Sequence, residues 1–403
     1  MFTVLISVCF LLSCEETPLQ KELPKITLHK KSAEIIKADN ALAFELFREV
    51  NLLSEQENIM ISPLSVSYAL AMTYNGAAGT TLEAFNDVLH FGELTSEEVN
   101  ESYKDLMDQM LDLDEKVEFS IANSIWYRLG FPVLSEFIQT NKDYFDAEVQ
   151  EADFSDSRTL DLINGWIENR TNDRIQDMLD YIPGDAMMYL INAVYFNAPW
   201  KYEFIKEDTY FGIFKLADET QHTVDYMSMR GSFQFTSNED FRAVELPYGD
   251  SAFSMVVMLP MVDNTIDELV AGLDADKWDS WFEHSRFYRD RVDLPKFKYE
   301  FKELLNEPLI TLGLEEAFAP DADFTRITPP GGIYISRVIH QTFIDVKEEG
   351  TEAAAATIVE MRDGASGEGP SFFIADRPFL YVIKENSTGA IVFIGKVGKP
   401  EHS

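Results

Sequence analysis

The segment from Val346 to Gly369 constrains the fold more than any other part of this 403-residue chain. Read with a period of two, it places small or apolar residues on one face and charged residues on the other, which predicts a half-buried strand. The first face holds Thr351, Ala353, Ala355, Thr357, Val359 and Met361, and the second holds Glu352, Glu360 and Arg362. Four consecutive alanines instead suit a helix, and the Gly/Ser/Asp-rich end suits a linker. The pattern therefore allows a helix with a linker, or a segment that is loop in one state and strand in another.

Two motifs favour the second interpretation. The residues Glu348-Glu-Gly-Thr-Glu-Ala-Ala-Ala355 resemble the reactive-centre hinge of the serpin family, which precedes an exposed bait loop. Downstream, Phe373-Ile-Ala-Asp-Arg-Pro-Phe-Leu380 resembles the family's C-terminal signature. Both motifs occur in the family's order and near its spacing, and the resemblance extends from about residue 32 to residue 400.

The resemblance implies a mixed α+β fold with three β-sheets, about nine helices and an exposed reactive-centre loop at about 348–372. We expect a single domain over residues 32–400, because no linker or repeat divides it. The hinge would comprise Glu348, Glu349, Gly350, Thr351, Glu352, Ala353, Ala354, Ala355, Ala356 and Thr357. The same comparison suggests five residues beneath or beside the central sheet, namely Ser62, Ser65, Asn192, Trp200 and His340.

The expected main role of Ser62 and Ser65 is structural. Ser62 suits a helix N-cap, and Pro63 suits the first position of the helix that follows. That helix is apolar on all sides, which predicts burial. By resemblance, Trp200 lies where the sheet opens to admit the hinge, and His340 is a buried histidine bonded to the central strand near Asn192.

The N-terminal residues indicate export. Residues 1–13 are apolar but too short for a stable membrane anchor, and they end before Cys14 in a sequence that resembles a bacterial lipobox. We expect lipidation of Cys14, a polar tether over 14–31, and an outer-membrane or cell-surface lipoprotein or an extracellular protein. An ordinary secretory signal or a frayed N-terminus is the alternative. Cys9 is the only other cysteine, so the fold is expected to lack disulfides.

Charge and motif content exclude several functions. A formal net charge of -37 argues against nucleic acid, heparin-like polyanions and anionic membrane surfaces as partners, apart from the lipid anchor on Cys14. The six histidines show no metal-ligand spacing, and no P-loop or nucleophile elbow is present. We therefore expect neither an enzyme nor a cofactor or metal, and a monomer as the working form.

The function that the resemblance implies is suicide inhibition of a serine protease, or of a cysteine protease. The target would cleave the loop and remain bound as an acyl-enzyme while the hinge inserts into the central sheet. A non-inhibitory binding or carrier protein is the alternative, but the uncharged first face of the hinge favours insertion.

The scissile bond is predicted by counting along the loop. Counting forward from Glu348 gives Gly364-Ala365, whereas counting back from Pro378 gives a bond near Gly367. Alternation keeps the first face uncharged as far as Met361, and Asp363 is its first carboxylate, which favours a bond between Met361 and Ala365. We prefer Gly364-Ala365, with Arg362-Asp363 second and Met361 as a further candidate.

Overall fold

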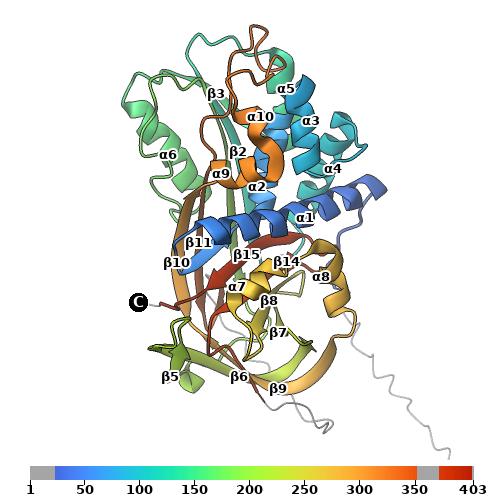
Figure 1. Ribbon diagram of the computed structural model, residues 1–403, viewed down its shortest axis with the longest axis vertical. Coiled ribbons are helices and arrows are strands. Elements are labelled where there is room, and N and C mark those ends of the chain that lie inside the picture. Colours follow the sequence, from blue (N-terminus) through green and yellow to red (C-terminus); the bar gives the residue numbers. More distant parts are fainter. Residues whose placement is uncertain (1–22, 352–371, 402–403) are drawn as a thin grey trace, which may run out of the picture.

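Residues 23–351 and 372–401 are described by the structure, which is a computed structural model. Its helices lie mainly at one end of the molecule and its long twisted strands extend to the other (Figure 1). A short 3-10 turn spans Lys206–Asp208, and a five-residue π segment, Ile310–Leu314, joins the last two helices. The helices are α1 (Lys30–Leu53), α2 (Pro63–Tyr74), α3 (Gly79–Val88), α4 (Ser96–Met110), α5 (Ser135–Phe145), α6 (Arg158–Arg170), α7 (Ile266–Ala271), α8 (Ala275–Phe282), α9 (Asn306–Leu309) and α10 (Glu315–Phe318).

The strands of the described residues form two hydrogen-bonded sheets. The six-stranded sheet has the order β10-β11-β12-β4-β2-β3, and the larger one has the order β1-β15-β14-β8-β7-β6-β9-β13, with β5 paired to β6. The strands are β1 (Asn58–Ile61), β2 (Glu118–Arg128), β3 (Glu148–Ala152), β4 (Met188–Pro199), β5 (Tyr210–Lys215), β6 (Gln221–Ser237), β7 (Phe241–Pro247), β8 (Phe253–Pro260), β9 (Arg286–Pro295), β10 (Phe297–Leu304), β11 (Ile339–Lys347), β12 (Gly350–Thr351), β13 (Phe373–Ile374), β14 (Phe379–Glu385) and β15 (Ile391–Val397).

This architecture confirms the mixed α+β class. The described part of the chain holds nine helical segments if α9, the π segment and α10 are counted as one interrupted helix after α1 to α8. Two of the three predicted sheets are joined into one ladder, because the 17-residue strand β6 pairs with β7 near one end and with β9 along much of its length. A long twisted strand can serve two sheets in this way, which short sequence patterns do not reveal.

The central helix α2 is buried on nearly all sides, as its composition predicts. Ser62 is its N-cap and accepts a hydrogen bond from the Ser65 amide at 3.4 Å, and Pro63 follows at the first helical position. The helix contacts both β4 and β15, so it links the two sheets. The first helix, α1, begins at Lys30, inside the predicted tether. Ile26 is also buried, so the last residues of the predicted tether lie against the domain.

Helix α6 covers the six-stranded sheet through a small core of its own. Ile163 and Ile167 lie in one buried cluster with Trp126 of β2 and Ile191 of β4, separate from the main core. No side chain caps the N-terminus of α6 at Ser157.

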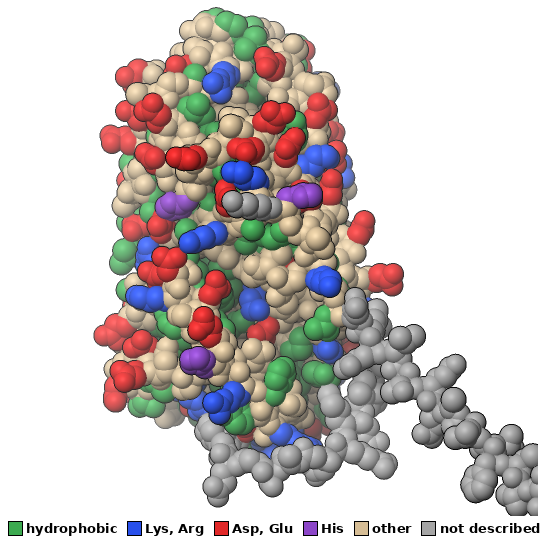
Figure 2. Space-filling view, turned by 90° about the vertical axis from the view of Figure 1, so that its right-hand side faces the viewer, with side chains coloured by type: hydrophobic (Ala, Val, Ile, Leu, Met, Phe, Trp, Pro, Cys, Tyr) green, Lys and Arg blue, Asp and Glu red, His purple; other side chains and the backbone are tan. Residues whose placement is uncertain are grey.

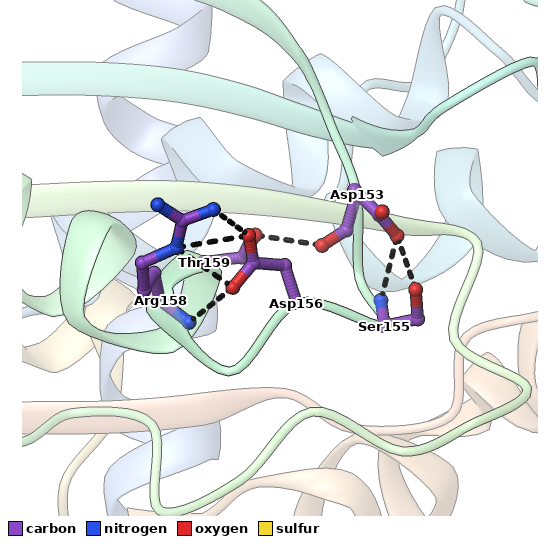
Figure 3. A network of polar contacts seen from close by, with 5 residues as sticks. All are labelled: Asp153, Ser155, Asp156, Arg158 and Thr159. Atoms are coloured by element: carbon purple, nitrogen blue, oxygen red, sulfur yellow. Dashed lines mark hydrogen bonds and ion pairs between the residues drawn. The ribbon is translucent and has the colours of Figure 1, made fainter.

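The turn before α6 supplies polar contacts instead (Figure 3). The Asp153 carboxylate accepts hydrogen bonds from the backbone and hydroxyl of Ser155, and the Asp153 carbonyl accepts one from Thr159 at 2.7 Å. Asp156 forms an ion pair with Arg158. These contacts link the turn after β3 to the first residues of α6. Within residues 23–351 and 372–401, no helix has the length and apolar character needed to cross a membrane.

Candidate functional site

Two residues of the hinge already lie inside the six-stranded sheet. Gly350 and Thr351 form β12, which pairs antiparallel with Val346 and Lys347 of β11 on one side and with Ala198 and Pro199 of β4 on the other. These hinge residues thus join β11 to β4, because they pair with both strands. The site is the meeting point of the hinge with the end of the central sheet.

Gly350 is required by this geometry. Its φ is +151°, a conformation that L side chains rarely adopt, and a Cβ there would lie 2.2 Å from the Ala198 carbonyl oxygen. The glycine therefore allows the chain to turn from β11 into the space beside β4.

Thr351 is held by an aromatic pair. Its side chain is buried, and its hydroxyl lies 2.6 Å from the Tyr248 hydroxyl. Tyr248 stacks on Trp200 with ring centroids 4.4 Å apart, and the Trp200 indole donates a hydrogen bond to the Lys347 carbonyl at 2.9 Å. Trp200 therefore lies beside β12, and Tyr248 is a partner that the sequence did not indicate.

Two carboxylates anchor the first residues of the hinge. Glu348 is buried; its carboxylate accepts a hydrogen bond from Thr209 at 2.8 Å and forms an ion pair with Lys296 at 3.1 Å. Burial favours the neutral acid, but these two partners outweigh it and hold the pKa of Glu348 below its usual value. Glu349 forms an ion pair with Lys206. We call Trp200, Tyr248, Lys296, Glu348 and Thr351 the hinge cluster.

A second polar cluster lies deeper under the same sheet, and we call it the mid-sheet cluster. Ser62, Ser65, Asn123, Asn192 and His340 belong to it, and all five are buried. The Ser65 hydroxyl hydrogen-bonds to the Asn192 side chain, and Asn192 donates to Asn123 at 2.6 Å. His340 accepts the Ser62 amide hydrogen at 3.0 Å instead of the expected bond to the central strand near Asn192.

The mid-sheet cluster predicts a specific pH dependence of stability. Burial lowers the pKa of His340 to about 4, so the folded state holds the neutral ring whereas the unfolded chain takes up a proton near pH 6.5. The contribution of His340 to the free energy of unfolding is therefore fully present above pH 6.5. It is lost as the pH falls toward 4, which lowers the free energy of unfolding by about 3 kcal/mol in total. Unfolding in urea at pH 7.5 and at pH 4.5 measures it.

The control variant is His340→Gln, which removes the titrating ring but keeps a hydrogen-bond acceptor. Asp39 changes the stability in the opposite direction with pH. Burial raises its pKa to about 7, so its contribution to the free energy of unfolding is lost as the pH rises. Only the difference between the wild type and the variant therefore isolates His340. An equal fall in stability in both proteins would contradict this assignment.

Several predicted residues lie outside the described residues. These are Cys14, the hinge residues Glu352, Ala353, Ala354, Ala355, Ala356 and Thr357, and the candidate reactive-bond residues Met361, Arg362, Asp363, Gly364 and Ala365. Conversely, sequence analysis missed Tyr248, Lys296, Thr209 and Lys206. Tyr248 follows Pro247 at the end of a strand, where nothing in the local pattern marks it as a hinge contact.

Comparison with known proteins agrees with this geometry. The sequence profile described as "Serpin (serine protease inhibitor)" matches residues 37–400. A serpin-like protein of Methanosarcina acetivorans is 36% identical over 385 residues, which covers 92% of this chain and 88% of the relative. Human serpin B3 is 31% identical and covers 90% of this chain and 98% of its own.

The solved structures give the same result. The crystal structure of the thermophilic serpin tengpin in its native state superposes with a TM-score of 0.82 at 34% identity, and it covers 93% of this chain and 96% of its own. The family as a whole contains inhibitors and binding proteins and is not generally catalytic. With the profile, the relatives and the fold in agreement, the chain belongs to the serpin family.

Proposed function

We propose that this serpin inhibits a serine protease as a suicide substrate. The catalytic serine of the protease attacks the carbonyl carbon of the reactive bond; a new ester forms, the peptide C–N bond breaks and the amine leaves with a proton. The freed hinge then enters the six-stranded sheet as a full strand and carries the acylated enzyme with it. The loop is consumed, so the protein is an inhibitor and not an enzyme.

One observation carries this proposal: the register of β12. Among the described strands, β4 and β11 are connected only through β12, and β4 has β2 on its other side while β11 has β10. If β12 continued antiparallel to both β4 and β11, each of these two strands would have a hydrogen-bonded neighbour on both sides along its length. Each step forward along the hinge is then one step back along β4 and β11.

The extended register matches the sequence alternation. Thr351 pairs with Ala198 and Val346, so residue 353 would lie opposite Phe196 and Ile344. Residue 355 would lie opposite Val194 and Thr342, and residue 357 opposite Asn192 and His340. All six of these partners are buried.

The face that the sequence leaves small and uncharged is thus the face that must enter a buried layer. In this register Thr357 would reach the mid-sheet cluster, where Asn192 and His340 already bind polar partners. A hydroxyl at that position can join the cluster, whereas an aliphatic side chain would add no partner.

The expected driving force is large. Each ladder hydrogen bond contributes roughly 0.5–1.5 kcal/mol, so a strand of about ten residues supplies on the order of 10 kcal/mol. Burial of the apolar side of the strand adds to this. The hinge cluster holds Gly350 and Thr351 in position, so insertion has a defined starting point.

The test is to mix the protein with trypsin, chymotrypsin, pancreatic elastase and subtilisin. An inhibitory serpin should give an adduct with at least one of them that survives boiling in denaturant, as seen on a gel. Protein whose loop has been cut beforehand is the control and should give none. Cleavage of the loop by all four enzymes with no adduct would overturn the proposal in favour of a non-inhibitory binding protein.

The reactive bond can be located in the same experiment. We expect the C-terminal fragment released on adduct formation to begin at Ala365, which would suit enzymes with small specificity pockets. Mass spectrometry of the fragment measures its first residue. A fragment beginning at Asp363 would instead indicate a trypsin-like target that cleaves after Arg362, and one beginning after Gly367 would show that the forward count fails.

A further inference from the structure

A carboxyl group lies buried among the helices. Asp and Glu side chains are spread over the face of the molecule shown in Figure 2, where solvent reaches them. Asp39 of α1 is instead only 6% exposed. It lies where α1 meets both α2 and α4, and these two helices also contact each other (Figure 1). A carboxylate in such a position is costly unless it is paired or protonated.

The contacts of Asp39 come from one tyrosine and one serine. The Tyr103 hydroxyl of α4 donates a hydrogen bond to Oδ1 of Asp39 at 2.8 Å. The Ser67 hydroxyl of α2 faces the same carboxyl group, and both partners are fully buried. Among the described residues, the second Asp39 oxygen, Oδ2, and the Ser67 hydroxyl each lack a hydrogen-bond partner. A proton on Oδ2 would let Asp39 donate to Ser67, which satisfies both atoms with one bond.

Apolar and aromatic side chains surround this carboxyl group. The rings of Tyr68 and Tyr103 have centroids 4.8 Å apart, and Phe145 of α5 lies against both. The Tyr68 hydroxyl donates to the Tyr103 carbonyl at 2.6 Å, so it does not serve Asp39. The α1 side chains within one turn of Asp39 on the same side of the helix are apolar, namely Ile35, Ile36, Leu42 and Ala43.

No cation neutralises Asp39 among the residues that the structure describes. The titratable groups that face it are the two tyrosines. The charged side chains on the next turn of α4 bind elsewhere: Lys104 pairs with Asp108 at 3.6 Å, and Asp105 accepts a hydrogen bond from Ser32 at 2.8 Å. Burial therefore raises the pKa of Asp39 to about 7, although the bond from the tyrosine hydroxyl opposes this rise. The carboxyl group of the folded protein thus gains or loses its proton near neutral pH.

Helix α2 connects this site to the sheet that must open for insertion. Ser67 lies two positions after Ser65, whose hydroxyl bonds to Asn192 of β4 in the mid-sheet cluster. The helix as a whole contacts β4. A charge left beside Ser67 therefore disturbs the helix that lies under β4.

We propose that Asp39, Ser67 and Tyr103 form a buried proton-binding site that sets the lifetime of the inhibitory state. This proposal rests on the inhibitory function proposed above. With the proton bound, Asp39 is neutral and donates to Ser67, and the three helices stay packed. When the proton passes to water, an unpaired carboxylate remains in the core, α2 and α4 loosen, and the sheet opens more often without a protease. The inhibitor therefore lasts longer in mildly acidic than in alkaline surroundings.

Infrared spectroscopy tests the proton directly. The folded wild type should show the carbonyl stretch of a protonated carboxyl group at pH 6, and this band should be lost by pH 8.5. Asp39→Asn should lack the band at both pH values. Tyr103→Phe should keep it to a higher pH, because the tyrosine hydroxyl favours the carboxylate. Absence of the band from the wild type at pH 6 would mean that Asp39 is already ionised, and would overturn the site.

A second experiment measures how long the inhibitor survives. Intact protein is stored at pH 6 and at pH 8.5, and its remaining capacity to form adduct is titrated with the protease of the panel that reacts fastest. The half-life of the wild type should fall about tenfold between the two pH values. The half-life of Asp39→Asn should change much less, because the amide keeps a donor for Ser67 without a titrating proton. Asp108→Asn is the matched control, since it removes an exposed carboxylate of α4, and it should follow the wild type.

All variants should form adduct with the wild-type stoichiometry when fresh, which shows that they fold. If Asp39→Asn does not fold, Tyr103→Phe takes its place, and its half-life should fall at a higher pH than that of the wild type. A half-life that is equal at both pH values, or that falls equally in wild type and variant, would overturn the regulatory role while adduct formation still supports the inhibitory function. Failure of the wild type to form any adduct would overturn the inhibitory function and the regulatory role together.

Discussion

Cleavage of the reactive loop should raise the melting temperature of this protein by at least about 10 °C. The cut would free the hinge to continue β12 between β4 and β11, which would extend the two described residues of this strand, Gly350 and Thr351, into a full strand. A gain on the order of 10 kcal/mol corresponds to a shift of this size in a domain of nearly 400 residues. The intact protein is then kinetically trapped, and its lifetime depends on the barrier to insertion.

Scanning calorimetry of intact and loop-cleaved protein measures this shift. The loop is cut with a protease that hydrolyses it and dissociates without forming an adduct. Mass spectrometry verifies that only one bond is broken. Loop-cleaved Ala355→Pro protein is the control, because it lacks an amide donor in the middle of the new strand and should gain little. Equal melting temperatures for intact and cleaved wild type would indicate a serpin that does not insert its loop.

Much of the fold was predictable because the patterns involved are local. The Ser62-Pro63 start and all-round apolar character of α2 predicted a capped, buried helix, and the structure confirms both. The alternation in the hinge predicted an uncharged face, and its one described member on that face, Thr351, is buried. In each case, the side chains that decide the conformation lie within a few residues of one another.

The contacts that position the hinge were not predictable, because they join distant segments. Tyr248 lies 103 positions from Thr351, and Lys296 lies 52 positions from Glu348. The pairing of His340 with the Ser62 amide instead of the central strand likewise depends on how closely α2 approaches β11. No spacing rule within one segment contains this information.

Substitutions at inward hinge positions should convert the inhibitor into a substrate. In the extended register, residue 355 enters the sheet opposite Val194 and Thr342, both of which are buried. A charge there would be desolvated without a partner, and proline would remove a ladder donor, so insertion slows while the protease still completes hydrolysis. Ala355→Arg and Ala355→Pro should therefore raise the number of inhibitor molecules consumed per trapped enzyme by about tenfold or more, a rise that corresponds to at least about 1.4 kcal/mol in the barrier to insertion.

The preceding residue, Ala354, provides a matched control for the variants at position 355. Ala354 falls on the face that carries Glu352 and Glu360, so Ala354→Arg introduces the same side chain on the outward side and should leave the stoichiometry close to that of the wild type. Thr351→Arg should also produce a substrate, because the buried contact with Tyr248 leaves no room for a guanidinium. Titration of a fixed amount of protease, followed by measurement of residual activity and adduct yield on gels, gives the stoichiometry of each variant. Equal stoichiometry for Ala354→Arg and Ala355→Arg would mean that position 355 does not enter a buried layer, and the register argued from β12 would then be wrong.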